Sequence, residues 1–358
     1  MENVMLLQIF ADAGAVVNTT AGSVNAATGE KEASAALDSS LKDFYDTELL
    51  ENAKSEMIYA QLGKKQPLPA GHGTTVEWRK WNTFQKADKL EEGVIPSGQK
   101  FGMSSKSGTI EQYGTYAAIS DKLEMRAYDD IILGATEEMG ASAAETQETL
   151  IRDALLTNTN VWYCDNINAD GQFLNTPTQP SEMSGDMENQ GLCLLTPDMV
   201  SRIVTKLRKD RVPTIDGKYV AVIHPSVAYD LRKSAEWMEA HKYCAVKELF
   251  NGEIGELHGC RFIENVFAPV LGGQEYENEH GGVVYATYFF GKDAFGIIDP
   301  EGGALEMIIK DKSEIGGPLN QFSTVGYKLE TNGATVLYPE RVLRAMSCSS
   351  FSYTDQPN

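Results

Sequence analysis

The chain has 358 residues, of which 42% are hydrophobic, so it is long enough for about two domains of ordinary size and able to bury a sizeable core. These values argue against disorder of the whole chain. The 51 acidic residues outnumber the 31 basic ones and give a formal net charge of -20, which disfavours tight, sequence-independent binding to nucleic acid.

The cysteine content indicates reduced thiols. The five cysteines are odd in number and widely spaced, and none lies in a C-x-x-C pair, which argues against a disulfide framework or a zinc ribbon. We expect them to be small packing residues of a protein in a cytoplasmic setting. They are Cys164, Cys193, Cys244, Cys260 and Cys348.

The first residues resemble a secretory signal only superficially. Residues 4–10 are apolar and residues 11–13 read Ala-Asp-Ala, as before a cleavage site. However, no Lys or Arg precedes the apolar run, Glu2 has the wrong charge, and Gln8 interrupts the run, so we expect no signal peptide. No stretch reaches the apolar length of a membrane span, and the sequence predicts a soluble protein.

The N-terminal third begins with an arm. Residues 11–36 are rich in small and polar side chains, which is typical of a flexible arm or of a segment ordered only by a partner. Helical spacing of apolar residues then predicts an amphipathic helix over residues 37–62. Gly63, followed by Pro67 and Pro69, ends it.

A long β-hairpin is predicted next. Residues 74–81 alternate as a strand, and residues 109–119 form a second strand pattern. The polar segment 85–108 between them is far longer than a usual hairpin loop. Because a two-stranded ribbon has no core of its own, it must be held by the body of its own chain or by a neighbouring subunit.

Apolar periodicity predicts a helix over residues 130–156 that is roughly 40 Å long. Asp129 and Asp130 suit its first turn by charge, and Gly134 and Gly140 weaken it locally.

The rest of the chain predicts a mixed α/β pattern after an irregular, polar segment at residues 157–195. Pro197 opens a helix, residues 219–223 form a buried strand, and Ser226 caps a short helix at 227–233. Asp216-Gly217 signals a tight turn. Further strands are expected at 260–263, 283–290, 326–331, 335–338 and 341–346, with a glycine-rich loop at 271–282.

No enzyme motif is present. The sequence contains neither a phosphate loop nor a G-x-S-x-G elbow, and Ser39-x-x-Lys42 is best interpreted as one turn of a solvated helix. None of the five histidines pairs with another at i, i+4, and His224, at a strand end before Pro225, is best explained by structure. We therefore expect no catalytic residue, no cofactor-binding residue and no metal ligand.

One segment has the outline of a calcium loop. Asn166-x-Asn168-x-Asp170-Gly171 matches its first half, but Pro177 occupies the twelfth position, where a bidentate Glu is needed. The segment is better interpreted as a turn rich in Asn and Asp.

The order of arm, long hairpin, long helix, α/β region and closing strands resembles the Hong Kong ninety-seven fold of tailed-phage capsids. More specifically, the chain is similar to the N-four-type family of phage major capsid proteins. The stretches that carry the resemblance are Leu41-Lys42-Asp43-Phe44-Tyr45 with Leu49-Leu50; Pro67-Leu68-Pro69 with Gly73-Thr74-Thr75-Val76-Glu77-Trp78-Arg79; Leu90-Glu91-Glu92-Gly93-Val94-Ile95-Pro96; Gln112-Tyr113-Gly114 with Ile119-Ser120-Asp121; His224-Pro225 with Asp230-Leu231-Arg232; and Gly252-Glu253-Ile254-Gly255 with Gly259 and Phe262-Ile263.

The resemblance implies an α+β capsid fold with five segments. They are an N-terminal arm and helix at 1–65, an extension loop at 66–125, a peripheral domain with a long spine helix at 126–190, an axial domain at 191–308, and the C-terminal strands of the peripheral domain at 309–358. Some relatives cross-link their subunits through a lysine of the extension loop. Lys89, Lys100 and Lys106 are the residues available for this, and we predict no cross-link.

The implied function is that of a major capsid protein that self-assembles, as pentamers and hexamers, into an icosahedral shell around double-stranded DNA. The implied location is the virion capsid, assembled in the host bacterial cytoplasm. Portal, scaffold and decoration proteins are further candidate partners, with no sequence-specific DNA binding, no membrane and no enzymatic activity. The alternatives are an encapsulin-like bacterial nanocompartment shell and a cytoplasmic hydrolase with a site built from distant residues.

Overall fold

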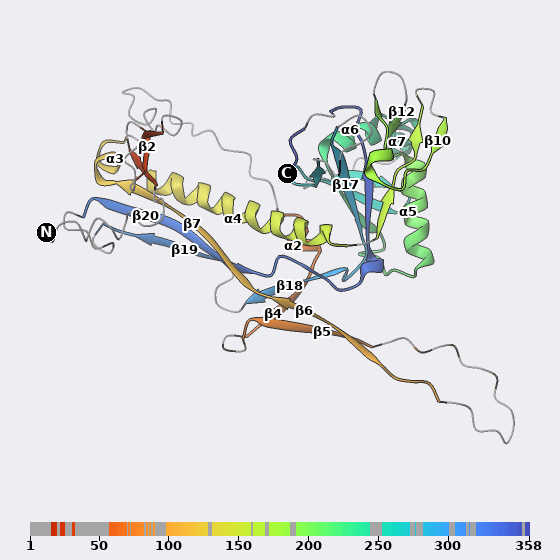
Figure 1. The fold of residues 1–358 in the computed structure, drawn as a ribbon, viewed down its shortest axis with the longest axis horizontal. Helices are drawn as coiled ribbons and strands as arrows, with labels where there is room; N and C mark the ends of the chain where they lie inside the picture. The colour runs from red at the N-terminus through yellow and green to blue at the C-terminus, as the bar shows by residue number, and fades with distance from the viewer. Residues whose placement is uncertain are drawn as a thin grey trace. The chain divides into compact units, whose positions relative to one another are not determined.

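The computed structural model describes the backbone of three short strands before residue 33 and most of residues 57–358 (Figure 1). The gaps within 57–358 are 70, 72, 82–83, 85, 87–88, 90–97, 128–130, 159, 169–171, 187–190, 244–252, 273–275, 277–281, 301–304, 313–314, 316–319 and 353–354. The chain forms two compact units. Unit 1 contains Met1–Ser55, Glu111–Gln147 and Pro300–Thr331; unit 2 contains Glu56–Ile110, Glu148–Asp299 and Asn332–Asn358.

Unit 1 is organised around a long antiparallel sheet. Strands β7 (Glu111–Ser120) and β20 (Phe322–Thr331) pair along their whole lengths, and β19 (Leu305–Lys310) pairs with β20. These strands confirm the predicted strand 326–331 and show that it begins earlier, at Phe322.

Three short strands extend this sheet beyond β7. Strand β1 (Val16–Thr19) runs parallel to β7, followed by β2 (Gly22–Asn25) and β3 (Lys31–Glu32). The expectation of an arm without structure of its own is therefore wrong for these strands. An open sheet edge offers backbone hydrogen bonds, and a segment can join it without large apolar side chains.

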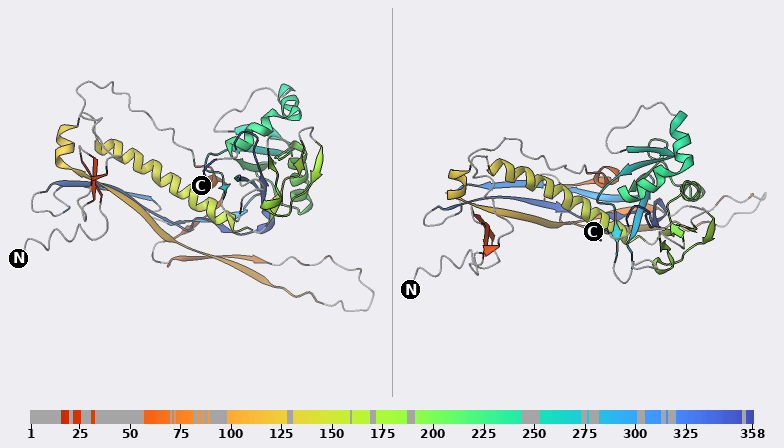
Figure 2. Two further views of the ribbon diagram at one scale, coloured as in Figure 1. Left: turned by 45° about the horizontal axis from the view of Figure 1, so that its top comes forward. Right: turned by 90° about the horizontal axis from the view of Figure 1, so that it is seen from above.

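The long helix α4 (Ile131–Leu156) confirms the predicted helix (Figures 1 and 2). Its first half lies in unit 1, where Ile131, Ile132, Ala135 and Met139 pack against buried residues of β7, β20 and the short helix α3 (Asp121–Arg126). About two turns further on, the Thr146 hydroxyl lies 3.0 Å from the hydroxyl of Tyr327. The apolar stripe read from the sequence is thus the face that covers the sheet.

Unit 2 contains a seven-stranded mixed sheet. The path runs β14, β15, β13, β17, β22 and β8, and β16 pairs with β17. The bounds are β8 Val161–Tyr163, β13 Tyr219–Ile223, β14 Glu253–Leu257, β15 Cys260–Glu264, β16 Val270–Leu271, β17 Val284–Phe290 and β22 Val342–Ser347. The predicted strands at 219–223, 260–263, 283–290 and 341–346 are confirmed to within a residue or two.

Both faces of this sheet are covered, which explains its uninterrupted apolar strands. On one face, Tyr219, Ala221 and Ile223 belong to a core shared with α5 (Pro197–Lys209) and α6 (Pro225–Lys233). On the other face, Val222 packs in a second core with Tyr59, of α2 (Tyr59–Leu62), and with the end of α4. The alternation of strand residues therefore divides the side chains between two cores.

Smaller elements complete unit 2. The segment 157–195, expected to be irregular, forms short strands because its polar side chains bond to one another across a small sheet. Helix α2 ends at Leu62, which confirms the predicted stop; residues before 57 in the predicted helix lie outside the described part. The remaining bounds are β4 Lys64–Leu68, β9 Asn166–Ile167, β10 Phe173–Asn175, η3 Pro180–Glu182, β11 Gly185–Asp186, β12 Gly191–Cys193, α7 Ala235–Tyr243, β18 Phe295–Pro300, β21 Thr335–Val336 and η4 Pro339–Arg341.

Turn and cap predictions are confirmed with one correction. Asp216 and Gly217 both have positive φ and close a tight turn between Ile215 and Lys218, as the sequence predicted. Helix α6, however, begins two residues earlier than expected. Its cap is His224, whose Nδ1 accepts a hydrogen bond from the Ser226 backbone at 3.2 Å, because Pro225 occupies the first helical position.

One buried carboxylate holds the short helix α2 in unit 2. Glu148 is 1% exposed and accepts hydrogen bonds from the backbone N–H groups of Tyr59 and Ala60, both at 3.2 Å. The side-chain amide of Asn265 donates a third at 3.3 Å. Burial raises the pKa of the Glu148 carboxyl, although these hydrogen bonds offset part of the effect.

Replacement of Glu148 by Ala leaves three donors unsatisfied in the core, so we expect a loss of about 3 kcal/mol in the free energy of unfolding. The raised pKa means that the native state binds a proton more readily than the unfolded state. Wild-type stability should therefore fall as the pH rises through that pKa, whereas Glu148→Gln should lack this dependence. Denaturant unfolding at a series of pH values across the mildly acidic range measures both effects. If the free energy of unfolding of Glu148→Gln depends on pH as steeply as that of the wild type, the dependence does not come from Glu148.

Candidate assembly surface

The predicted hairpin exists, but its second strand is not the one expected. Strand β5 (Thr75–Trp81) pairs antiparallel with β6 (Met103–Thr109), in a register that matches Thr75 with Thr109 and Trp81 with Met103. The predicted partner, residues 109–119, instead forms most of β7 in the sheet of unit 1. The sequence placed β6 in the loop because Met-Ser-Ser-Lys-Ser-Gly-Thr has no apolar alternation.

The root of the hairpin is seated on its own unit. A Cβ atom added to Gly296 of β18 would lie 2.8 Å from the indole ring of Trp78, so the ring packs directly on that glycine. Gly108 of β6 gives similarly little room, because an added Cβ would lie 2.6 Å from Thr335. Lys80 adds an ion pair with Glu340 at 3.0 Å. Contacts of its own chain therefore support β5 as far as Lys80, one residue before the strand ends.

Even so, most side chains of the ribbon are exposed to solvent. The side chains of β5 alternate between exposed and half-buried, and in β6 every residue except Gly108 is exposed. The three lysines considered for cross-linking, Lys89, Lys100 and Lys106, are exposed as well. Two strands bury too little to be stable alone, and the exposed side chains of β5 and β6 form the candidate assembly surface.

His224, interpreted from the sequence as a structural residue, packs beside an aromatic ring. Its ring lies 5.0 Å from that of Tyr285, and burial lowers the pKa of its imidazole. Ser226 and Asp355 lie nearby, which brings together the residue types of a hydrolytic triad. The Ser226 hydroxyl, however, donates to Asp355 at 3.1 Å, so its proton is directed to the carboxylate and not to the imidazole.

Asp355 and Asp230 instead attach the C-terminal segment to α6. Asp355 also accepts a hydrogen bond from Tyr285 at 2.7 Å, and Asp230 accepts from the Ser349 hydroxyl at 2.9 Å and the Ser350 backbone at 2.8 Å. Sequence reasoning did not identify these residues, because Asp230 and Asp355 are 125 positions apart and carry no local pattern.

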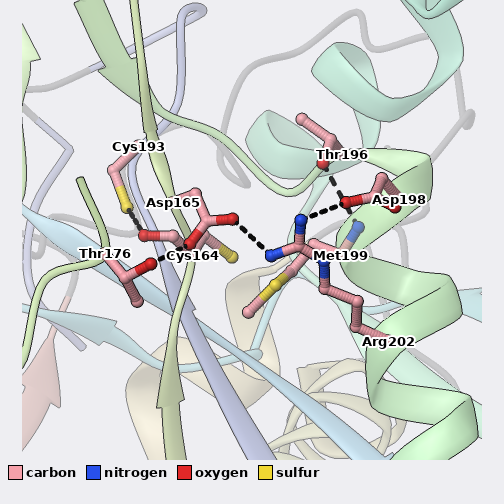
Figure 3. Close-up of polar contacts among 8 residues, drawn as sticks. All are labelled: Cys164, Asp165, Thr176, Cys193, Thr196, Asp198, Met199 and Arg202. Atoms are coloured by element: carbon pink, nitrogen blue, oxygen red, sulfur yellow. Dashed lines mark hydrogen bonds and ion pairs between the residues drawn. The ribbon is translucent and has the colours of Figure 1, made fainter. Parts of the chain in front are cut away.

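A polar cluster joins helix α5 to the small sheet (Figure 3). The guanidinium of Arg202 bridges Asp165 at 2.7 Å and Asp198 at 2.8 Å, and the Thr176 hydroxyl donates to Asp165 at 2.6 Å. At the start of α5, the hydroxyl of Thr196 accepts a hydrogen bond from the backbone N–H of Met199 and so caps the helix. These bonds hold surface elements together and expose no activated nucleophile.

The four cysteines described by the structure are buried and form no disulfide, which agrees with the sequence prediction of packing thiols; Cys244 lies outside the described residues. The thiol of Cys193 donates to the carbonyl of Cys164 at 2.8 Å (Figure 3). Burial raises the pKa of Cys164, Cys193 and Cys260, so these thiols stay protonated and weakly nucleophilic.

In the segment that resembles a calcium loop, Asn side chains bond to the backbone and to one another. The side chain of Asn168 accepts a hydrogen bond from the backbone of Gln172 at 2.7 Å, and Asn166 is hydrogen-bonded to Asn175 and Ser184. Asp170, Gly171 and the Ser39–Lys42 pair lie outside the described residues. Among the residues with assigned positions, no cluster of three or more His, Cys, Asp or Glu side chains is arranged to hold a metal ion. Within the described ranges no helix has the length and hydropathy of a bilayer span.

Comparison with known proteins identifies the family. A family model described as phage capsid protein matches residues 104–309, more than half of the chain. The chain belongs to the phage capsid protein family. A search of curated proteins finds no match.

Solved capsid structures share the fold. The chain superposes on the capsid protein of Cyanophage Pam1 with a TM-score of 0.63 at 12% identity, covering 90% of this chain and 99% of that one. For the capsid of Cyanophage P-SCSP1u the TM-score is 0.62 at 13% identity, with 86% and 93% covered. The SrpI encapsulin of Synechococcus elongatus gives 0.53 at 11% identity, with 89% and 96% covered.

These findings confirm the α+β capsid fold of the Hong Kong ninety-seven type. Together with the family, they confirm the expectation of a major capsid protein, a structural protein of the virion capsid that self-assembles into the shell. The encapsulin is the weaker structural match.

The seat of Trp78 predicts a sharp effect at Gly296. Gly296→Ala places a methyl group against the indole, and we expect this to displace the ring and cost roughly 1–3 kcal/mol of stability. Cleavage of β5 and β6 by protease should become faster while the central sheet stays folded. Gly98→Ala is the matched control, because an added Cβ there meets nothing within 4 Å. Equal cleavage rates for the two variants would contradict the packing of Trp78 on β18.

The buried thiols predict slow alkylation. In the folded protein, Cys164, Cys193, Cys260 and Cys348 should resist iodoacetamide at neutral pH, and all four should react after denaturation. Mass spectrometry of peptides after a timed exposure gives the result for each cysteine. Rapid labelling of any of the four in the native protein would show that its surroundings open.

Proposed function

We propose that the chain is a non-enzymatic shell subunit that forms pentamers and hexamers of an icosahedral capsid around double-stranded DNA, assembled in the host bacterial cytoplasm. The observation that supports this best is a hairpin seated at its root and exposed along most of its length. In this proposal the segments 66–125, 126–190 with 309–358, and 191–308 act as extension loop, peripheral domain and axial domain.

The extension loop is proposed to lie across an adjacent subunit. The monomer leaves nearly all of β6 exposed, and a neighbouring copy would cover that surface only in the assembled state. Stability would then come from many copies of a modest interface, and assembly would depend steeply on protein concentration.

The charge of the chain agrees with a container for DNA. The chain has a net charge of -20, so an inner wall built from it would enclose DNA without binding the DNA phosphates tightly. In this proposal the DNA is cargo and is not bound by sequence. Portal, scaffold and decoration proteins are the further partners that such a shell would need, and the shell has no membrane.

An encapsulin-like shell around a protein cargo is the second candidate, favoured by the match to SrpI encapsulin. The two candidates predict the same assembly and differ in contents. The matched region of the phage capsid family model favours the phage shell.

The proposal predicts closed shells from purified protein. Electron microscopy and sedimentation at a series of concentrations should show few intermediates between subunits and shells, with a sharp threshold concentration. Particles from infected or induced cells should contain double-stranded DNA. A protein that stays monomeric at high concentration, with β5 and β6 protected from protease, would contradict the proposal.

A further inference from the structure

Three aromatic rings stack at the distal end of the hairpin. The ring of Phe101 lies between two others: its centroid is 4.4 Å from that of Trp81, with 14° between the planes, and 5.3 Å from that of Phe84, with 10°. The stack begins where the paired strands end, because Trp81 and Met103 are the last matched residues of β5 and β6. We call Trp81, Phe84 and Phe101 the aromatic stack.

The aromatic stack is exposed to solvent. Trp81 is 59% exposed, Phe84 55% and Phe101 58%, and the adjacent Met103 is 47% exposed. Removal of such apolar surface from water lowers the free energy, so a cluster of this kind on a protein surface marks a site of interaction. The rings already hold one another in place, so that little conformational entropy remains to be lost on binding.

Charge indicates what the stack binds. Residues 75–109 contain six Lys or Arg and four Asp or Glu, a net charge of +2, which leaves -22 for the rest of the chain, since the total is -20. Lys86 and Lys100 are exposed close to the stack in the sequence. A basic ribbon on an acidic molecule is complementary to the body of another copy of the same molecule.

We propose that the aromatic stack is the anchor of the hairpin on a second copy of this chain, where it enters an apolar site rimmed by carboxylates. The inference rests on the proposed function, in which the hairpin lies across an adjacent subunit. It identifies the residues that hold the hairpin on that subunit. Aromatic residues dominate the binding energy of many interfaces, while the contacts around them contribute little. In this arrangement the aromatic stack supplies most of the affinity of the hairpin for the second copy, and the Ser-rich strand β6 contributes little to it.

The experiment compares assembly thresholds of single variants. Trp81→Ser and Phe101→Ser should each raise the concentration needed for assembly by roughly tenfold or more, because hot-spot truncations exceed one factor of ten in affinity. Trp81→Phe keeps the stack and should assemble at nearly the wild-type concentration. Phe173→Ser is the matched control, since Phe173 is 61% exposed on β10 and should not matter.

Charge is tested in the same assay. Lys100→Glu should raise the threshold, and the increase should shrink at high salt. Lys209→Glu, at the exposed end of α5, is the control and should have a smaller effect.

Fluorescence reports the burial of Trp81 directly. The difference between the emission of wild type and Trp81→Phe isolates this residue, and its maximum should move to shorter wavelength when shells form. Wild-type thresholds for Trp81→Ser and Phe101→Ser would overturn the inference but leave the proposed function intact. Failure of the wild type to assemble at all would instead count against the proposed function. A shift of Trp81 emission that needs an accessory protein would assign the stack to that partner and overturn the inference.

Discussion

A two-stranded ribbon cannot bury its own side chains, and this constraint determines how the molecule is used. Strands β5 and β6 satisfy one another's backbone, but only Val76, Trp78 and Lys80 of β5 and Gly108 of β6 are partly or fully covered. Its own unit supports the ribbon where Trp78 packs on Gly296, Gly108 approaches Thr335 and Lys80 pairs with Glu340. The exposed rings and lysines beyond these contacts are the surface that we propose a neighbouring copy covers.

The body that carries the ribbon is built on the opposite principle. The central sheet of unit 2 is apolar on both faces, and successive residues of β13 enter different cores. Packing on both sides leaves little freedom for the strands to slide or twist. A rigid sheet of this kind can keep the root of a projecting ribbon in a constant direction relative to its own unit.

Several polar side chains of unit 2 hold this body together. Glu148 anchors α2, Asp230 and Asp355 attach the C-terminal segment, and Arg202 connects α5 to the small sheet. Each group already has partners that satisfy it, and satisfied buried networks add specificity to a fold. The fold itself is shared with the Cyanophage Pam1 and Cyanophage P-SCSP1u capsids at only 12–13% identity. Such divergence is possible because cores tolerate substitution when their volume and hydrophobic pattern are kept.

The sequence alone determined the elements whose signals are local. The stripe of α4, the buried strands β13 and β17, the Asp216-Gly217 turn and the stop after Leu62 all follow from spacing or from backbone preference. The order of the predicted elements, together with the six quoted stretches, was sufficient to recognise the capsid family. The tertiary structure decided which strands pair. Residues 111–120 joined β20 and left β6 to β5, because sheet partners are selected by long-range packing that no short pattern records. It also decided the partners of Glu148, Asp230 and Asp355, and the meeting of Trp81, Phe84 and Phe101, since residues far apart in the chain come together only when the backbone is folded.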